Sequence, residues 1–420
     1  MQLLNKINIS RLAQHRLVKQ TSLLFSSEFI ATILGIFTGM INTRALGKEG
    51  YGQIAFIYSV INITSLIFNF GLFNAGSRCL AKAGNDSDEE REIVGALLLA
   101  FGVIMFVFCG LIFSFGFFID QIFHSQVNHV FLLVPILAIA YPLEQLLYQI
   151  CQGTNKIGQM AFFKIFPRTA YLIIALGVVF WSELTVSISV ILNLGNILLA
   201  GLFTAYQFKP SFRNLRHHWT HLWEETKSYG FHVYLGRVSS LATYDSTKLL
   251  VAYFSDTTMT GFYNLAVLLS SPMVMLSRAL SISLFKSFLP EKKVSQKVTQ
   301  FNLGWLVACT LFLILAGKFI ITTLYTAEYA PTYPLLIILS IATLFRGLIQ
   351  PYNLFMGAKG CGKQLRNTAF ILTFSILAFN LALIPFLGST GAALASLCAL
   401  FVNYWAHLFY YRKVLRLGLV

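Results

Sequence analysis

The chain has 420 residues, of which 56% are hydrophobic and only 11% are charged, and its mean hydropathy is +0.70. A soluble globular protein carries about 25% charged residues, so this composition excludes that class and indicates a protein built to lie in lipid. The formal net charge of +15 would suggest nucleic-acid binding in a soluble protein. Here the basic residues lie in short segments between apolar runs, so we attribute them to membrane topology and expect no nucleic-acid partner.

A helix that crosses the hydrocarbon core of a bilayer needs about 20 mostly apolar residues. The sequence contains twelve such segments, which predicts an all-α polytopic membrane protein with twelve transmembrane helices. Pro142, Pro167, Pro272 and Pro351 fall inside the fourth, fifth, eighth and tenth segments, where we expect them to interrupt the helix. The predicted segments are residues 22–42, 53–74, 93–119, 130–151, 160–181, 185–207, 229–254, 261–288, 299–324, 332–356, 367–387 and 390–411.

Lysine and arginine are unevenly distributed among the connections between these segments. Every second connection is basic, and the connections between them are short and nearly free of cations, except for the first, which carries Arg44 and Lys48. Because basic loops stay on the cytoplasmic side, both termini are expected in the cytoplasm. The residues that carry this signal include Lys6, Arg11, Arg16, Lys19, Arg78, Lys82, Arg91, Lys156, Lys164, Lys209, Arg213, Lys227, Lys292, Lys293, Lys359, Arg366, Arg412 and Arg416.

Two pairs of weakly similar motifs indicate an internal repeat. "GYGQIA" at residues 50–55 is matched by "GFYNLA" at 261–266, and "YQICQGTNKIGQ" at 148–159 by "YNLFMGAKGCGK" at 352–363. The two pairs occur in the same order and at corresponding positions, which favours a duplicated six-helix unit with both copies in the same orientation. The predicted organisation is an N-terminal lobe of residues 1–207, a cytoplasmic connector of residues 208–228, and a C-terminal lobe of residues 229–420.

The connector contains "RHHWTHLW", in which three histidines suggest a metal site. The alternative is an amphipathic helix at the membrane interface, because Leu215, Trp219, Leu222 and Trp223 recur at helical spacing beside basic residues. No cysteine or carboxylate completes a zinc ligand set there, so we prefer the helix and expect no metal. The chain also lacks a GxxxxGK[ST] loop, and its six cysteines lie in segments or cytoplasmic connections, where we expect them to be reduced.

The segment at 229–254 carries Arg237, Asp245 and Lys248 on one helical face. A charge inside the bilayer costs about 2.5 to 3.5 kcal/mol, so such residues face a partner or a water-filled space. We predict that this face lines a space between the lobes, with Arg237 as the main phosphate contact. Asp245 and Lys248 are three residues apart, so the alternative is that they pair with each other.

Five further charges fall in other segments. The acids Glu28 and Glu144 are candidates for coupling to an ion, as is Asp245, while the cations Arg168, Arg278 and Arg346 join Arg237 and Lys248 as candidates for substrate binding. The alternative for Glu28, Arg168 and Lys248 is that they snorkel to the surface or form internal salt bridges. Four interior arginines against three carboxylates leave this region positive, which suits an anionic substrate because the guanidinium fork matches phosphate. The connections on the other side are about ten residues or fewer and leave little room for a catalytic site, so we predict a carrier rather than an enzyme.

Several stretches resemble one family. "NTRALGKEGYGQIAFIYSV", "FNFGLFNAGSRCLAK", "QGTNKIGQ" and "DSTKLLVAYFSDTTMTGFYNLAVLLSSP" look like the oligosaccharide-lipid flippases of the Wzx type. These belong to the multidrug/oligosaccharidyl-lipid/polysaccharide (MOP) exporters. The likeness covers nearly all of the chain, and it rests on glycines and polar residues rather than on a catalytic signature.

The resemblance implies a bacterial inner-membrane protein with two six-helix lobes around a cationic cavity. It implies movement of undecaprenyl-pyrophosphate-linked oligosaccharide across the membrane for the synthesis of O-antigen, capsule or exopolysaccharide, without a bound cofactor and driven by a proton or sodium gradient. Membrane lipids, a polysaccharide polymerase and a chain-length regulator are the implied partners. Three alternatives remain: a cation-coupled multidrug exporter of the same superfamily, a membrane enzyme that polymerises or ligates lipid-linked sugars, and a membrane scaffold that transports nothing and whose interior charges are fully paired.

Overall fold

The computed structural model describes residues 2–83, 87–284, 288, 291–359 and 361–416. Within its helices, the side chains of residues 2–22, 24, 25, 229, 232, 233, 235–244 and 283 lie outside the described set. The described part of the chain is helical and contains no β-strand, which confirms the predicted all-α class.

The helices before the connector are α1 (Gln2–Ile67), α2 (Leu72–Ala83), α3 (Asp88–Gly116), α4 (Ile119–Phe123), α5 (Asn128–Leu133), α6 (Pro135–Ala138), α7 (Ala140–Gly153), α8 (Ile157–Trp181) and α9 (Val186–Gln207). The connector forms α10 (Leu215–Glu225) and a π-helical turn, η1 (Thr226–Gly230). The remaining helices are α11 (Phe231–Phe254), α12 (Thr257–Ser270), α13 (Pro272–Ser283), α14 (Gln296–Ile320), η2 (Ile321–Tyr325), η3 (Ala327–Tyr329), α15 (Thr332–Ala358) and α16 (Gly362–Arg416).

Two of these helices each join two predicted segments at a glycine, although α1 ends at Ile67 and the predicted segment 53–74 is therefore broken before Leu72. The backbone of α1 leaves helical geometry at Gly47, where φ is +68°, and that of α16 does so at Gly388, where φ is +55°. Glycine takes this left-handed conformation without the steric cost that a Cβ imposes. In α16 the chain folds back closely, since a Cβ on Gly391 would lie 2.3 Å from the carbonyl oxygen of Leu383.

Within the described residues, seven helices are long and apolar enough to cross a membrane, or eight if the bent pair α12 and α13 is one crossing. The protein is therefore a multi-pass membrane protein. The number of twelve crossings stays a prediction, because α1 and α16 each pass this test as one long helix.

The predicted single helix over residues 130–151 is wrong. The chain there forms α5, α6 and α7, with breaks at Val134 and Ile139. Pro135 explains the first break, because proline lacks a backbone N–H and favours the first position of a new helix. Pro272 also begins a helix, and α13 is bent by 40° from α12.

The other three prolines differ in their effect on the helices. Pro167 and Pro351 lie inside helices α8 and α15, which continue through them. Pro142 lies near the start of α7, where a missing N–H costs little because the first turn has no helical acceptor for it. The predicted interruption is therefore wrong for Pro167 and Pro351, whereas the segment that contains Pro142 is interrupted at Ile139, just before the first turn of α7.

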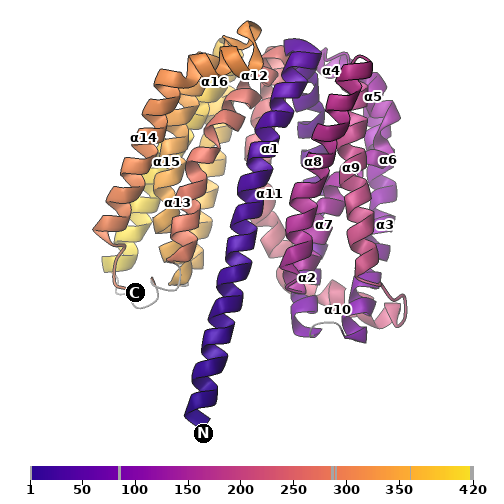
Figure 1. Ribbon diagram of the computed structural model, residues 1–420, viewed down its shortest axis with the longest axis vertical. Coiled ribbons are helices and arrows are strands. Elements are labelled where there is room, and N and C mark those ends of the chain that lie inside the picture. Colours follow the sequence, from indigo (N-terminus) through magenta and orange to yellow (C-terminus); the bar gives the residue numbers. More distant parts are fainter. Residues whose placement is uncertain (1, 84–86, 285–287, 289–290, 360, 417–420) are drawn as a thin grey trace.

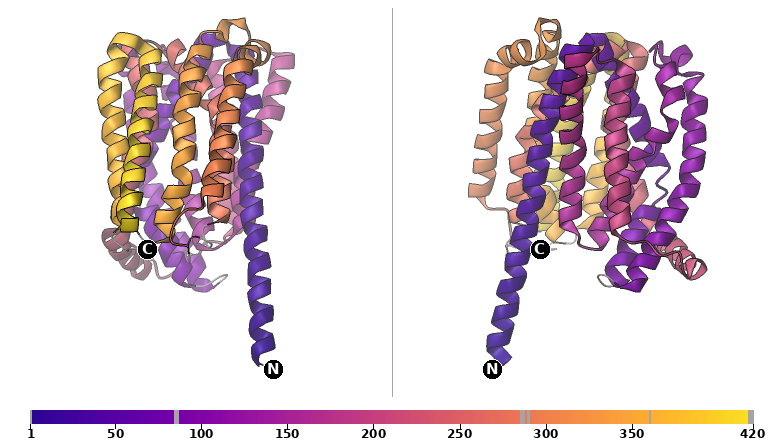
Figure 2. Two further views of the ribbon diagram at one scale, coloured as in Figure 1. Left: turned by 90° about the vertical axis from the view of Figure 1, so that its left-hand side faces the viewer. Right: turned by 45° about the vertical axis from the view of Figure 1, so that its right-hand side comes forward.

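The helices on either side of α10 stand next to each other in space, and we call them the N-terminal half (α1–α9) and the C-terminal half (α11–α16). In Figure 1, α1 and α11 lie between the two groups, and α10 lies at the same end as both termini. The turned views in Figure 2 show α1 extending beyond the bundle at that end. We call it the terminal end, and the end that contains Gly47 the Gly47 end. The predicted lobe boundaries stay a prediction.

Each half has its own buried apolar cluster. One cluster consists of residues between Ile54 and Leu222 together with Ala252, and a second consists of Tyr51 and residues between Val251 and Ala393. A smaller third cluster, which includes Phe288, Phe355 and Tyr411, lies within the C-terminal half. The buried apolar side chains of each half thus pack mainly within that half, while many other large apolar side chains face outward.

The two halves make close backbone contact at the Gly47 end. A Cβ on Gly52 would lie 1.9 Å from the carbonyl oxygen of Thr257, and one on Gly261 would lie 2.9 Å from Cα of Gly52. Gly52 and Gly261 come from the two echoing motifs, so the repeat-related segments pack against each other. This packing needs glycine because any side chain would occupy the space of the opposing backbone.

Arg44 strengthens the same contact. Its Nε and Nη2 donate hydrogen bonds of 2.9 and 2.7 Å to the carbonyl oxygens of Leu324 and Thr323 in η2. Carbonyls at the end of a helix have no helical partner, and a cation there is favourable. Arg44 departs from the alternating charge pattern of the sequence, and the structure gives it this bridging contact instead.

Candidate functional site

The structure brings charged residues together in two clusters between the halves. The first, which we call the Glu28 cluster, consists of Glu28 on α1, Lys164 and Arg168 on α8, Glu144 on α7 and Arg278 on α13. The second, the Asp245 cluster, consists of Asp245 and Lys248 on α11 and Asn62 on α1. Each cluster combines side chains from both halves.

Glu28 is the centre of the first cluster. Its Oε1 accepts a hydrogen bond of 2.9 Å from Nζ of Lys164 and lies 4.0 Å from Nη1 of Arg278. The three side chains are 35%, 21% and 59% exposed, in the order Glu28, Lys164, Arg278. A single carboxylate oxygen therefore contacts one cation from each half, and both ion pairs are accessible to solvent.

Lys164 and Arg168 both contact α1 because they are one helical turn apart on α8. The Lys164 ammonium also lies 5.6 Å from the ring centre of Tyr148, a favourable cation–π distance. The Arg168 guanidinium donates to the carbonyl oxygen of Ala31, one turn along α1 from Glu28. Both cations interact electrostatically with Glu144 on α7. With three cations and two carboxylates, the Glu28 cluster has a net positive charge.

The sequence analysis did not include Lys164 among the candidate site residues. It assigned Lys164 to a cytoplasmic connection, but the residue lies inside α8 and pairs with Glu28. The sequence does contain a signal for Lys164, namely its four-residue spacing from Arg168, which places both cations on one helical face. The partner of Lys164 is 136 positions away in the chain, and only the tertiary fold identifies it.

The Asp245 cluster is more buried. Nζ of Lys248 lies 3.2 Å from Oδ1 of Asp245, and these side chains are 19% and 16% exposed. Asn62 Nδ2 donates to Oδ2 of the same carboxylate, and the carbonyl oxygen of Lys248 accepts from Thr260 Oγ1 at 3.5 Å. The structure therefore realises the alternative in which Asp245 and Lys248 pair, and Lys248 does not present an unbalanced charge.

The other predicted cations are placed as follows. Arg346 lies on α15 with an exposed side chain, and its carbonyl oxygen accepts a hydrogen bond of 3.3 Å from Gln350. Arg237 lies on α11, and its side chain is outside the described residues, so its predicted contact with phosphate stays a prediction.

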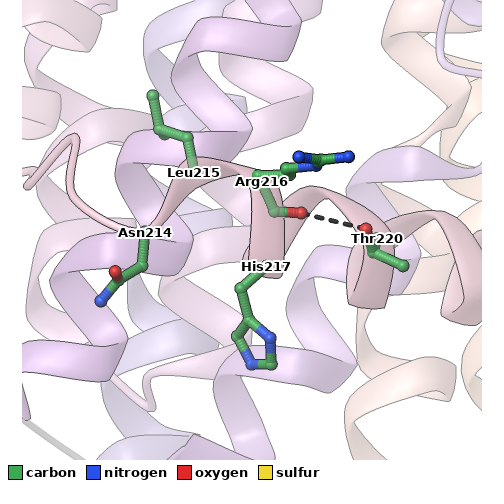
Figure 3. Close-up of a pocket in the computed structure, with 5 residues that line it drawn as sticks. All are labelled: Asn214, Leu215, Arg216, His217 and Thr220. Carbon is green, nitrogen blue, oxygen red and sulfur yellow. Dashed lines mark hydrogen bonds between the residues drawn. The ribbon is translucent and has the colours of Figure 1, made fainter.

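The connector carries a separate surface pocket of about 580 Å³, shown in Figure 3. It is lined by Asn214, Leu215, Arg216, His217 and Thr220, and Thr220 Oγ1 donates to the carbonyl oxygen of Arg216 at 3.0 Å. This pocket belongs to one side of α10 and includes no residue of either charged cluster. It is not the candidate site.

Two of the three histidines of the connector contact neighbouring helices. His218 Nε2 lies 2.8 Å from Oε2 of Glu92 on α3, and His221 Nδ1 lies 3.5 Å from Sγ of Cys79 on α2. Among the described residues, no group of three or more histidine, cysteine, aspartate or glutamate side chains is arranged to hold a metal ion. These contacts instead attach α10 to the N-terminal half.

Comparison with solved structures identifies the fold as that of the MOP exporters. The lipid II flippase MurJ in an inward closed conformation has a TM-score of 0.76 at 15% identity, and the match covers 93% of this chain and 87% of that one. An inward-facing MATE-family multidrug resistance transporter has a TM-score of 0.75 at 13% identity, with coverage of 95% and 98%. A MOP transporter from Pyrococcus furiosus, described as having a binding pocket of reversed polarity, has a TM-score of 0.62 at 12% identity, with coverage of 95% and 96%.

Residues 17–290 match the family model described as polysaccharide biosynthesis protein. This is more than half of the chain, and the protein therefore belongs to that family. Comparison with curated protein sequences found no significant match. The family and the fold together describe a membrane protein of polysaccharide biosynthesis whose solved structural relatives are flippases and transporters.

Proposed function

We propose that this protein is a Wzx-type flippase that moves undecaprenyl-pyrophosphate-linked oligosaccharide repeat units across the bacterial inner membrane by alternating access. The observation that carries the proposal is the Glu28 cluster. There, Lys164 and Arg168 from one half and Arg278 from the other converge on α1 with side chains that solvent reaches. Both termini are proposed to lie in the cytoplasm.

In this proposal the cations of the Glu28 cluster bind the pyrophosphate. Guanidinium groups form paired hydrogen bonds with phosphate oxygens, and an ammonium group adds a point charge. Arg237 and Arg346 are proposed to contribute further along the path. The polyprenyl tail remains in lipid, because transferring its many methylene groups into a polar space would be costly.

The halves are proposed to separate alternately at their two ends. The tight contact around Gly52, Thr257 and Gly261 supports a state that is closed at the Gly47 end. A proton or sodium gradient is the proposed source of energy, with Asp245, Glu144 and Glu28 as the coupling carboxylates. Membrane lipids, a polysaccharide polymerase and a chain-length regulator are the proposed partners.

A multidrug exporter is the second candidate, because the MATE-family transporter is nearly as similar in fold as the lipid II flippase. Cationic drugs need a site rich in carboxylates and aromatic rings. The excess of cations in the Glu28 cluster favours an anionic substrate instead. An enzyme that polymerises or ligates sugars is less well supported, since the solved structures with this fold are described as flippases and transporters.

The test of the proposal combines a cell assay with a purified system. Deleting the gene should cause polyprenyl-linked repeat units to accumulate in the cells, as measured by mass spectrometry of the extracted lipids. The purified protein in proteoliposomes should move a lipid-linked oligosaccharide between leaflets, and Arg168→Ala and Arg278→Ala should each lower that rate at least tenfold. Loss of resistance to cationic drugs, with no accumulated lipid-linked sugar, would support the multidrug exporter instead.

A further inference from the structure

Glu28 is the unexpected member of a site proposed to bind an anion. A carboxylate next to the binding cations repels phosphate, yet Glu28 is the residue that both Lys164 and Arg278 contact. We infer that the Glu28 carboxylate is a resident anion that occupies the phosphate position of the empty carrier and is displaced by the substrate. This inference rests on the proposed function and adds a competition step to it.

The geometry of the two ion pairs supports displacement. Oε1 of Glu28 makes a short contact of 2.9 Å with Lys164, whereas its distance to Arg278 is 4.0 Å, at the limit of an ion pair. Arg278 is 59% exposed, and a guanidinium has five N–H donors. A pyrophosphate brings more charge and more acceptor oxygens than one carboxylate oxygen, so it can engage donors that Glu28 leaves unused.

The position of the cluster explains why a carrier would keep such an anion. Lys164 belongs to the N-terminal half and Arg278 to the C-terminal half, so any step that brings the halves together without substrate brings two cations together. Like charges repel, and their repulsion grows as closure of the halves removes water from between them. Glu28 neutralises that repulsion in the empty protein, and the substrate phosphate does so in the loaded one.

Arg278 is also on an element that can move relative to α1. Helix α13 is set at 40° to α12 by the break at Ser271 and Pro272. Its contact with Glu28 is long, so a modest rotation of α13 would release the carboxylate and leave the guanidinium free to follow the phosphate. Lys164 is held in place by the ring of Tyr148 and remains as the fixed half of the site.

The experiment compares Glu28→Gln with wild type and with Glu49→Gln, a matched control that removes an exposed carboxylate from the same helix. Binding of inorganic pyrophosphate and of undecaprenyl pyrophosphate to the purified full-length protein is measured by titration calorimetry. Removing the competing anion should lower the Kd of Glu28→Gln by roughly two- to fivefold, the range expected for loss of a solvent-accessible ion pair. Glu49→Gln should bind like wild type.

The same variants are then tested for transport in proteoliposomes. Glu28→Gln should turn over more slowly at saturating substrate, because the empty carrier must return with unneutralised cations. Should Glu28→Gln not fold, Glu28→Asp replaces it. This variant keeps the charge but draws the carboxylate back by one methylene group. It should bind both probes more tightly than wild type, with a Kd lowered by less than about fivefold.

The outcomes separate the two proposals. If wild type binds neither probe, the proposed function fails and the competition step fails with it. If wild type binds and Arg278→Ala weakens binding, but Glu28→Gln binds no more tightly than wild type, the function stands and the resident-anion inference is overturned. Glu28 would then only position the two cations.

Discussion

At the scale of single residues, helical spacing is informative only within one helix. The spacing of three residues predicted that Asp245 and Lys248 can pair, and the structure contains that pair. It could not predict that Asn62 also donates to Asp245, or that Lys164 reaches Glu28, because those partners are 183 and 136 positions apart. Long-range contacts of this kind depend on how the helices pack, which one sequence does not specify.

Lys164 is expected to be required for transport even though sequence reasoning assigned it to a loop. Lys164→Gln removes the short contact with Glu28 and lowers the positive charge of the cluster, so the rate of flipping in proteoliposomes should fall at least tenfold. The matched control is Lys318→Gln, which removes an exposed lysine from α14. Equal rates for Lys164→Gln and Lys318→Gln would exclude Lys164 from the binding site.

At the scale of elements, apolar run length located the helices well and predicted their breaks poorly. Proline was taken as an interruption, but Pro167 and Pro351 lie inside continuous helices, whereas the chain breaks at Pro135, which the sequence analysis did not single out. A proline's effect depends on whether neighbouring helices satisfy the carbonyl that it leaves free. The amphipathic pattern of α10 was a better guide, since Leu222 is buried while Trp219 and Trp223 are exposed and stacked.

Glu225 attaches the end of α10 to α2, and this attachment should depend on its charge. The hydrogen bond from Lys82, with the nearby charges of Lys82, Arg78 and His221, lowers the pKa of the Glu225 carboxyl below its ordinary value. A lowered pKa in the folded state means that the stabilisation is complete above the ordinary carboxyl pKa and is lost as the pH falls through the lowered one. Acidification into that range should therefore release α10.

The substitution Glu225→Gln imitates that release at neutral pH. Hydrogen–deuterium exchange of residues 215–230 should be faster in this variant than in wild type, while exchange in α8 should be unchanged. Glu224→Gln is the matched control, because Glu224 is the exposed neighbour on the same helix. If both variants exchange like wild type at neutral pH, the Glu225 contacts do not hold α10 in place.

At the scale of the whole molecule, the weak echo between "GYGQIA" and "GFYNLA" has a physical explanation. Both motifs lie at the Gly47 end, and Gly52 from one packs against Gly261 from the other. The sequence could suggest that these segments correspond, but not that they touch. Their contact brings the backbones of the two halves together, and Arg44 and the edge-to-face rings of Tyr51 and Tyr329 lie at the same end of the molecule.

A side chain at Gly52 should therefore open the Gly47 end. The Cβ of Gly52→Ala would lie 1.9 Å from the carbonyl oxygen of Thr257, a backbone atom that cannot move aside without moving α12. Spin labels attached to cysteines at the exposed positions Lys48 and Glu328 should report a longer distance in this variant by pulsed electron resonance. Gly304→Ala is the control, because a Cβ there meets no atom within 4 Å. An unchanged distance in Gly52→Ala would mean that the glycine contact does not hold the halves together, whereas a longer distance with slower flipping would link closure at this end to transport.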